Sequence, residues 1–297
     1  MHSSDGTRSL TMMRMNQLRE GDVNVRDVRL HYIDWGGDGA PIVLLHATGL
    51  LGRIYRPIAQ ALTAVGHVFS YDQRGHGDSG VANPPKYDWA LTARDLEEFI
   101  RAMGLDGTRA FGHSAGATAI GAFASTHPEL ISRAVLTEPV LFESPESPEF
   151  GWRAPLLDRT LKRKRVFDSV EAMFANFERK PPYDAWRTDI LHDYCEYGTR
   201  LNADGKRELK CSPQIEAELY GTAHEFDGLG LLLRCEIPLL VMFGQRPGES
   251  PGAPLAPRLE SQMKNARFAN FPDAGHFLPM EKPEEVGRPA ADFLRQG

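Results

Sequence analysis

The segment Gly112–Gly116, with the sequence Gly-His-Ser-Ala-Gly, constrains the fold of this chain more than any other feature. A strand-like run at 108–111 precedes it and a run of small residues at 117–122 follows it, which is typical of a strand that turns sharply into a helix. We expect Ser114 to have a positive φ, because such a turn is strained and projects its hydroxyl outward. The two glycines are expected where a Cβ would clash as strand and helix close together.

Composition excludes several classes of partner. The chain has 297 residues, 41% of them hydrophobic, and a formal net charge of −6 with no basic stripe, which argues against nucleic acid or an anionic membrane as partner. No apolar run reaches the length of a membrane span, and residues 1–15 lack the apolar core of a secretion signal. Cys195, Cys211 and Cys235 lack metal-ligand spacing, so we interpret them as reduced thiols in a cytoplasmic protein.

Strand-like and helix-like segments alternate along most of the chain, which predicts a mostly parallel sheet with helices on both faces. The expected helices are 53–65, 89–103 and 284–295, and the expected strands are 28–35, 42–45, 68–71, 109–112, 134–137, 239–243 and 267–271. The alternation stops between Glu138 and about Cys235, where the chain is charged, aromatic and interrupted by prolines. We interpret that stretch as a helical insertion over the sheet.

Polar segments follow several of the predicted strands. They are His46–Gly49, Asp72–Ser79, Ser114, Glu138 and Asp273–His276. Because ligands of open parallel sheets bind outside the carboxyl ends of the strands, we expect these segments to surround one site. A serine, an acid and a histidine therefore occur there in chain order.

These motifs resemble those of the α/β-hydrolase superfamily, in the capped branch that uses a serine, a histidine and an acid. Gly112–Gly116 is similar to the family's nucleophile elbow, and Gly275-His276 resembles its C-terminal histidine motif. His46–Gly49 resembles its His-Gly-x-x-Gly oxyanion loop, with alanine at position 47 where glycine is usual. Asp72–Ser79 resembles its Asp-x-Arg-Gly-His-Gly-x-Ser segment.

The resemblance covers roughly residues 24–139 and 236–297. It implies a mostly parallel, eight-stranded sheet flanked by helices, with a helical cap inserted after strand 6. We expect a core formed by 24–139 and 234–297, a cap at 140–233, and an N-terminal extension at 1–23 for which disorder is one alternative.

The resemblance also implies a mechanism of acyl transfer to Ser114. His276 would take the hydroxyl proton and return it to the leaving group, while an acid orients the imidazole. The backbone N–H groups of Ala115 and Thr48 would bind the oxyanion.

The position of the acid departs from the usual pattern. Members of the family usually carry it after the strand that here is 239–243, but Gly244–Pro247 follows that strand and offers no carboxylate. Some members carry the acid after the preceding strand of the sheet, which here is Glu138. We therefore predict Glu138 as the acid, with Glu249 as the second alternative and Asp273 as the third.

Other polar and aromatic residues have structural interpretations. His46, Asp72, His76 and Asp78 are expected to satisfy backbone groups of the loops near strand ends. Three residues are expected to shape the substrate pocket, namely His113, Phe142 and Trp152. The scattered histidines lack metal-ligand spacing, so neither a metal nor another cofactor is expected.

The sequence thus predicts a cofactor-independent serine hydrolase of a small or medium-sized ester, lactone or related carbonyl compound. A carbon–carbon bond hydrolase, an acyltransferase and a cofactor-free perhydrolase use the same three groups and remain alternatives. A ligand-binding protein without catalysis, built on a hydrolase scaffold, is a further alternative because fold does not determine function. The expected partner is a small molecule, and a homodimer is left open.

Overall fold

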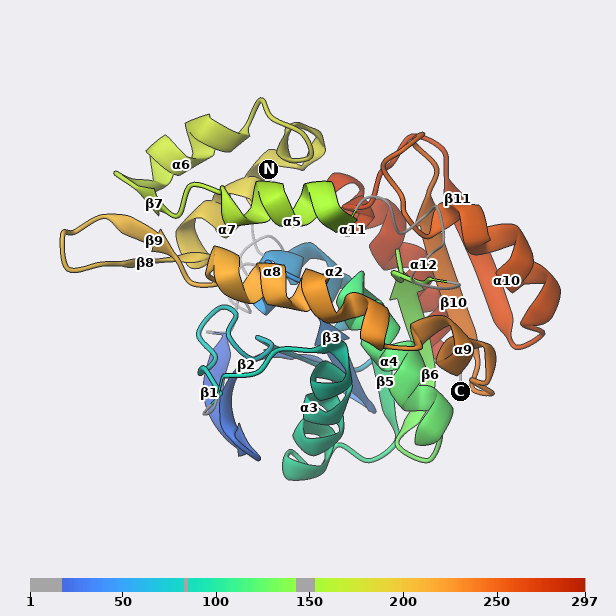
Figure 1. The fold of residues 1–297 in the computed structure, drawn as a ribbon. Helices are drawn as coiled ribbons and strands as arrows, with labels where there is room; N and C mark the ends of the chain where they lie inside the picture. Colours follow the sequence, from blue (N-terminus) through green and yellow to red (C-terminus); the bar gives the residue numbers. More distant parts are fainter. Residues whose placement is uncertain (1–17, 83–84, 143–152, 297) are drawn as a thin grey trace, which may run out of the picture.

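The computed structural model describes residues 18–82, 85–142 and 153–296, and an eight-stranded sheet runs through the middle of this part of the chain (Figure 1). The strand β2 pairs antiparallel with β1 and β4, whereas the remaining neighbours pair in parallel, as the sequence predicts. Across the sheet the order is β1 (Arg19–Val25), β2 (Val28–Gly36), β4 (His67–Tyr71), β3 (Pro41–Leu45), β5 (Thr108–His113), β6 (Ile131–Thr137), β10 (Leu239–Gly244) and β11 (Ala266–Phe271).

Helices cover both faces of this sheet. One face carries α3 (Trp89–Ala102), α4 (Ala115–Thr126), α9 (Gly228–Leu233) and α10 (Ala256–Gln262), and the other carries α2 (Arg56–Leu62) and α12 (Pro283–Arg295). The central strand β3 illustrates why its sequence is continuously apolar. Ile42 and Leu44 belong to one buried cluster and Val43 and Leu45 to the other, so both faces of the strand are buried.

The predicted strands are all present, with ends that differ from the expected ones by three residues at most. The sheet begins earlier in the chain than the sequence predicts. Its first strand, β1, starts at Arg19, inside the segment 1–23 that we expect to lie outside the core. This edge strand is largely polar and exposed, and its burial alternates over residues 21–25, but Val23 and Val25 are its apolar members, so the alternation is too short to predict a strand. Residues 1–17 of the expected extension lie outside the described part.

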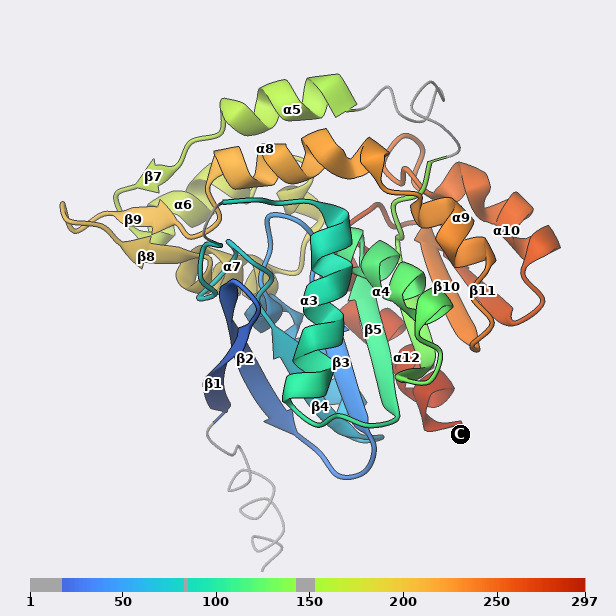
Figure 2. The same cartoon turned by 60° about the horizontal axis from the view of Figure 1, so that its bottom comes forward.

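Between β6 and β10 the described chain forms helices and one small sheet. The helices are α5 (Arg153–Leu161), α6 (Val170–Phe177), α7 (Thr188–Tyr197), α8 (Pro213–Thr222) and α9. The small antiparallel sheet contains β7 (Val166–Phe167), β9 (Arg207–Leu209) and β8 (Thr199–Leu201), which are too short for a period of two to be read from the sequence. Figure 2 shows α5 and α8 lying across one end of the main sheet.

The last helix of this stretch, α9, packs differently from the others. Leu229 and Leu232 are buried in the cluster on the face of the main sheet that α4 also covers. A Cβ on Gly121 of α4 would lie 2.9 Å from a methyl carbon of Leu232, so the two helices are in direct contact. The helices over the end of the sheet therefore stop before α9, which belongs to the layer that covers the sheet face.

Two buried histidines hold the loops that follow β3 and β4. The Nε2 atom of His46 accepts a hydrogen bond from Gln73 N at 2.8 Å, and Nε2 of His76 accepts one from Gly49 N at 3.0 Å. In each ring Nδ1 lies within 3.0 Å of a backbone carbonyl oxygen, so Nδ1 carries the proton. Burial lowers the pKa of each histidine to about 4, which keeps the ring neutral and able to accept.

Asp72 holds the same loops through its carboxylate. Its two oxygens accept hydrogen bonds from Gly52 N at 2.8 Å and from Asp78 N at 2.9 Å. The carboxylate of Asp78 is bound by Lys210 at 2.6 Å. The structural roles expected for His46, His76 and Asp72 are confirmed by these bonds, whereas Asp78 contributes its backbone N–H and pairs with a lysine.

Two glycines allow α4 to pack directly against the neighbouring strands. A Cβ on Gly112 would lie 2.7 Å from the Cα atom of Ala117, and a Cβ on Gly116 would lie 2.5 Å from the carbonyl oxygen of His46. These are backbone atoms that cannot move aside independently, so the clash expected at both positions is confirmed. The N-terminus of α4 is thereby held against the loop that follows β3.

The two buried histidines predict a pH dependence of stability. Their folded-state pKa values of about 4 lie below the ordinary value of 6.5, so between these pH values only the unfolded chain takes up the two protons. The free energy of unfolding should therefore fall as the pH is lowered from 6.5 toward 4, by up to about 1.4 kcal/mol per pH unit for each histidine. Urea unfolding at several pH values measures this slope. An undiminished slope in His46→Gln would show that His46 is not one of the groups that cause it.

The close approach at Gly116 predicts a steric penalty for a single methyl group. Gly116→Ala should lower the free energy of unfolding by about 1–3 kcal/mol, because the new Cβ meets backbone oxygens. Gly221→Ala in α8 is the matched control, since its Cβ would meet no described atom within 4 Å. That variant should be stabilised by about 0.5–1 kcal/mol, as expected for alanine in a helix. Thermal or urea denaturation compares the two, and equal effects would rule out the clash.

Candidate active site

Ser114 lies at the sharp turn between β5 and α4. Its φ is 56° and its ψ is −124°, so the positive φ expected from the sequence is confirmed. A non-glycine residue in this region of backbone space is strained by roughly 1–3 kcal/mol, and the surrounding structure must hold it there. Part of that support comes from the neighbouring strand, because Ser114 N donates to the carbonyl oxygen of Thr137 in β6 at 2.9 Å.

Three predicted residues from distant parts of the chain meet at this turn. The Nε2 atom of His276, in the loop after β11, lies 2.9 Å from Ser114 Oγ. On the other side of the ring, Nδ1 lies 3.2 Å from a carboxylate oxygen of Glu138. The imidazole therefore bridges hydroxyl and carboxylate, an arrangement that can move a proton off the serine while the acid stabilises the resulting charge.

Glu138 is held at the end of β6 by groups from the next strand and its following loop. Its side chain is wholly buried, with a relative exposure of 0%, and its φ of 52° is the other strained backbone value at the site. One carboxylate oxygen accepts a hydrogen bond from Gly244 N at the end of β10. The oxygen that faces His276 also accepts one from Ser250 Oγ at 2.6 Å. These donors compensate the cost of burying a carboxylate.

The two alternative acids occupy different environments. The carboxylate of Glu249 pairs with Arg246 at 2.6 Å, and its side chain is 48% exposed. Only its backbone is in contact with the histidine, because the carbonyl oxygen of Glu249 accepts a hydrogen bond from His276 N at 3.1 Å. Asp273 is exposed and its backbone oxygen binds Arg246. The geometry therefore favours Glu138 over both.

The two residues predicted to bind the oxyanion lie at the start of α4 and in the loop after β3. Ala115 is the first residue of α4, and the first N–H groups of a helix have no partner within it and carry partial positive charge. Thr48 lies in the loop after β3, where the neighbouring Ala47 N and Gly49 N donate inward to Tyr55 and His76. Within the described chain, the buried hydroxyl of Thr48 has no hydrogen-bond partner.

The side chain of His113 is wholly buried and bound on both sides of its ring by groups of the protein. Its Nδ1 lies 2.6 Å from the hydroxyl of Tyr55, and its Nε2 lies 2.7 Å from the carbonyl oxygen of His276. The expectation that it shapes the substrate pocket stays a prediction.

The other two expected pocket residues are aromatic. Phe142 is half-buried and packs against the apolar cluster that contains Ala115, Trp89 and Leu219, so it lies near the nucleophile turn. Trp152 lies outside the described residues. Neither Tyr55 nor Ser250 is indicated by the sequence, because a tyrosine or a serine in a loop carries no local pattern that indicates a distant hydrogen-bond partner.

A hydroxyl on α4 fixes the chain immediately after the acid. Thr118 Oγ1 donates to the carbonyl oxygen of Val140 at 2.9 Å and accepts a hydrogen bond from Val140 N at 2.9 Å. Both backbone groups of Val140 are therefore satisfied by one side chain. This clamp lies two residues beyond Glu138 and marks where the chain leaves the sheet.

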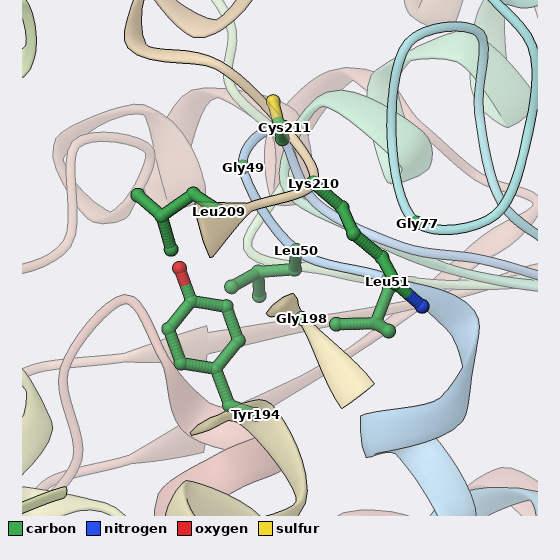
Figure 3. A pocket seen from close by; sticks show the side chains of 9 residues that line it. All are labelled: Gly49, Leu50, Leu51, Gly77, Tyr194, Gly198, Leu209, Lys210 and Cys211. Atoms are coloured by element: carbon green, nitrogen blue, oxygen red, sulfur yellow. The ribbon is translucent and has the colours of Figure 1, made fainter. Parts of the chain in front are cut away.

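Two further features lie beside the site. Figure 3 shows a small pocket in which Tyr194 of α7 faces Leu50 and Leu209, and none of its lining residues is Ser114, Glu138 or His276. Among the residues described, the ligand atoms of His31, Asp72 and Asp78 come within 4.8 Å of one another, as a metal site requires. Asp72 and Asp78 already bind backbone N–H groups and Lys210, so their carboxylates are occupied.

Two further observations concern the cysteines and the length of the helices. Cys195, Cys211 and Cys235 are buried free thiols, as the sequence predicts. In the described part of the chain, every helix is too short or too polar to cross a lipid bilayer.

Comparison with known proteins identifies the family. The model of the alpha/beta hydrolase family matches residues 42–288. A putative non-heme chloroperoxidase of Synechocystis sp. is 25% identical, with 93% of this chain and 98% of that protein covered. N-formylmaleamate deformylase of Pseudomonas putida is also 25% identical, with 92% and 96% covered.

A solved structure extends this likeness to the fold. The crystal structure of E-2-(acetamidomethylene)succinate hydrolase superimposes with a TM-score of 0.82 at 19% identity, with 94% of this chain and 99% of that chain covered. The family match spans most of the sequence, and the relatives found are named as enzymes. This chain therefore belongs to the alpha/beta hydrolase family, and the prediction of an enzyme of that family is confirmed.

Proposed function

We propose that this chain is a serine hydrolase that forms an acyl-enzyme on Ser114 from a small or medium-sized ester, lactone or related carbonyl compound. The observation that carries the proposal is the continuous contact from Ser114 Oγ through the imidazole of His276 to the buried carboxylate of Glu138, over 2.9 Å and 3.2 Å. A binding protein without catalysis would not need all three groups in this geometry.

The reaction follows from these contacts. His276 Nε2 removes the Ser114 hydroxyl proton as the oxygen attacks the substrate carbonyl, and then donates that proton to the leaving group. Water, deprotonated by the same nitrogen, attacks the acyl-enzyme; the bond to Ser114 Oγ breaks, the acid product leaves, and His276 returns the proton to Oγ. Glu138 keeps the proton on Nδ1 and stabilises the charged imidazole, while the N–H groups of Ala115 and Thr48 bind the oxyanion.

Within the segment 140–233, helices α5 to α8 act in this proposal as a cap over the reacting serine, whereas α9 packs on the sheet face. Support comes from the close approach of α8 to the oxyanion loop. A carboxylate oxygen of Glu216 in α8 would lie 2.8 Å from a Cβ on Gly49, next to Thr48. Arg163 binds the same carboxylate at 2.7 Å and the hydroxyl of Tyr183 at 3.0 Å. Apolar packing of Phe142 against the cluster around Ala115 supplies one wall.

The second candidate function uses the same acyl-enzyme with another acceptor. The putative non-heme chloroperoxidase relative, matched over nearly its full length, favours a perhydrolase in which hydrogen peroxide replaces water. The deformylase relative favours including N-acyl compounds among the carbonyl substrates. Peracid formation from an ester plus hydrogen peroxide, measured beside simple hydrolysis, distinguishes the two acceptors.

Replacing the serine tests the proposal directly. Ser114→Ala should abolish labelling by a fluorophosphonate probe and lower hydrolysis of p-nitrophenyl acetate by about 10⁴-fold or more, with the fold retained. Ser132→Ala, at an exposed position of β6, is the control and should react as the wild type does. Wild-type protein that reacts with neither reagent would refute the proposed function.

Two isosteric variants test the acid. Glu138→Gln should lower the rate of acylation by roughly 10³–10⁴-fold, because the amide cannot stabilise the protonated imidazole. Glu249→Gln should change it by no more than about twofold, since that carboxylate is half-exposed and paired with Arg246. Stopped-flow or burst kinetics with p-nitrophenyl acetate compares them. The reverse result, an active Glu138→Gln and an inactive Glu249→Gln, would show that the acid is misassigned.

A further inference from the structure

We propose that Tyr55 and His113 are positioning residues that join the oxyanion loop to the backbone of His276 through one buried chain of hydrogen bonds. The chain runs from Ala47 N to the Tyr55 hydroxyl at 3.1 Å, and from that hydroxyl to His113 Nδ1 at 2.6 Å. It ends where His113 Nε2 meets the carbonyl oxygen of His276 at 2.7 Å. The inference rests on the proposed function, because it assigns these residues to the same site.

The two ends of the chain determine the position of every proton in it. A carbonyl oxygen can only accept, so Nε2 of His113 carries the hydrogen that binds His276. Nδ1 of the neutral ring is then a bare acceptor, and it takes the proton of the Tyr55 hydroxyl. The oxygen of that hydroxyl accepts from Ala47 N–H. Each donor therefore has one acceptor, and all three hydrogen bonds point in the same direction, from Ala47 toward His276.

The chain requires His113 to stay neutral, and its surroundings ensure this. Burial lowers the pKa of His113 well below its ordinary value, and the adjacent His276 lowers this pKa further. The two imidazole centroids lie 5.4 Å apart, so the charge that His276 acquires during the reaction opposes a second charge on His113. The Tyr55 hydroxyl is also kept protonated, because burial raises its pKa. Proton transfer is thereby confined to His276.

Both ends of the chain adjoin groups that the reaction needs. Ala47 precedes Thr48, whose N–H is one of the two proposed oxyanion donors. At the other end, His276 is held on both sides of its backbone, because its N–H donates to Glu249 and its C=O accepts from His113. Tyr55 comes from the 3₁₀ turn η1 (Gly52–Tyr55) and His113 from the end of β5. The chain thus fixes the spacing between the oxyanion loop and the base.

A pair of tyrosine variants provides a matched test. Tyr55 and Tyr71 are both buried, with relative exposures of 1%, but the hydroxyl of Tyr71 has no hydrogen-bond partner in the described chain. Covalent labelling by a fluorophosphonate yields the maximal rate kinact and the binding constant KI without knowledge of the substrate. Tyr55→Phe should lower kinact about tenfold, because a small misplacement of the reacting groups is costly. KI should change by less than about twofold, since the side chains of Tyr55 and His113 are both buried.

The control and a second variant complete the experiment. Tyr71→Phe should label with wild-type kinact and KI. His113→Leu removes both ring nitrogens and should lower kinact at least as much as Tyr55→Phe does. Adding Tyr55→Phe to His113→Leu should cause little further loss, because the two substitutions break the same chain. If Tyr55→Phe does not fold, the comparison of kinact between His113→Leu and Tyr71→Phe provides the test instead.

The outcomes separate this inference from the proposed function. A reactive wild type in which Tyr55→Phe and Tyr71→Phe have equal kinact would overturn the inference alone. Additive losses in the double variant would also overturn it, because they would show two independent effects on the core. Wild-type protein that no probe labels would overturn the proposed function, and the inference with it.

Discussion

The parallel pairing of β6 with its two neighbours is the constraint on which the site depends. On one side, His113 pairs with Thr137, and Ser114 N then donates to Thr137, so the nucleophile turn begins level with the end of β6. On the other side, Met242 of β10 pairs with Thr137, and its carbonyl oxygen accepts from Glu138 N at 2.8 Å. Serine and acid thus leave adjacent strands at the same level, with room for one imidazole between them.

Sequence reasoning succeeded where burial imposes a local pattern. The central strands are continuously apolar because both faces are covered, and Gly112 and Gly116 mark a backbone contact that tolerates no side chain. The same reasoning placed Ser114, Glu138 and His276 together because the carboxyl ends of parallel strands share an edge. Local composition and the geometry of a parallel sheet predicted that these segments meet, whereas the choice of Glu138 over Glu249 and Asp273 also relied on the resemblance to the α/β-hydrolase superfamily.

The features that the sequence did not reveal depend on distant partners. The edge strand β1 has an apolar alternation of two residues, Val23 and Val25, and the two- and three-residue strands β7, β8 and β9 are too short to have one, so pairing with neighbours defines all four. The direction of the His113 side chain depends on Tyr55, 58 residues earlier, and on the backbone of His276. Ser250 likewise reaches Glu138 across 112 positions. No window of sequence contains both members of such pairs.

The clamp between Thr118 and Val140 has a mechanical consequence. Helices α5 to α8 are connected to the sheet through the chain that leaves β6, only a few residues from the carboxylate behind the imidazole. The Thr118 hydroxyl binds both backbone groups of Val140 and so anchors this part of the chain to α4. Gly116 in turn lets α4 lie directly against the end of β3. The two strained backbone positions of the site, Ser114 and Glu138, are therefore braced by one and the same helix, which carries the turn of the first and binds the chain just after the second.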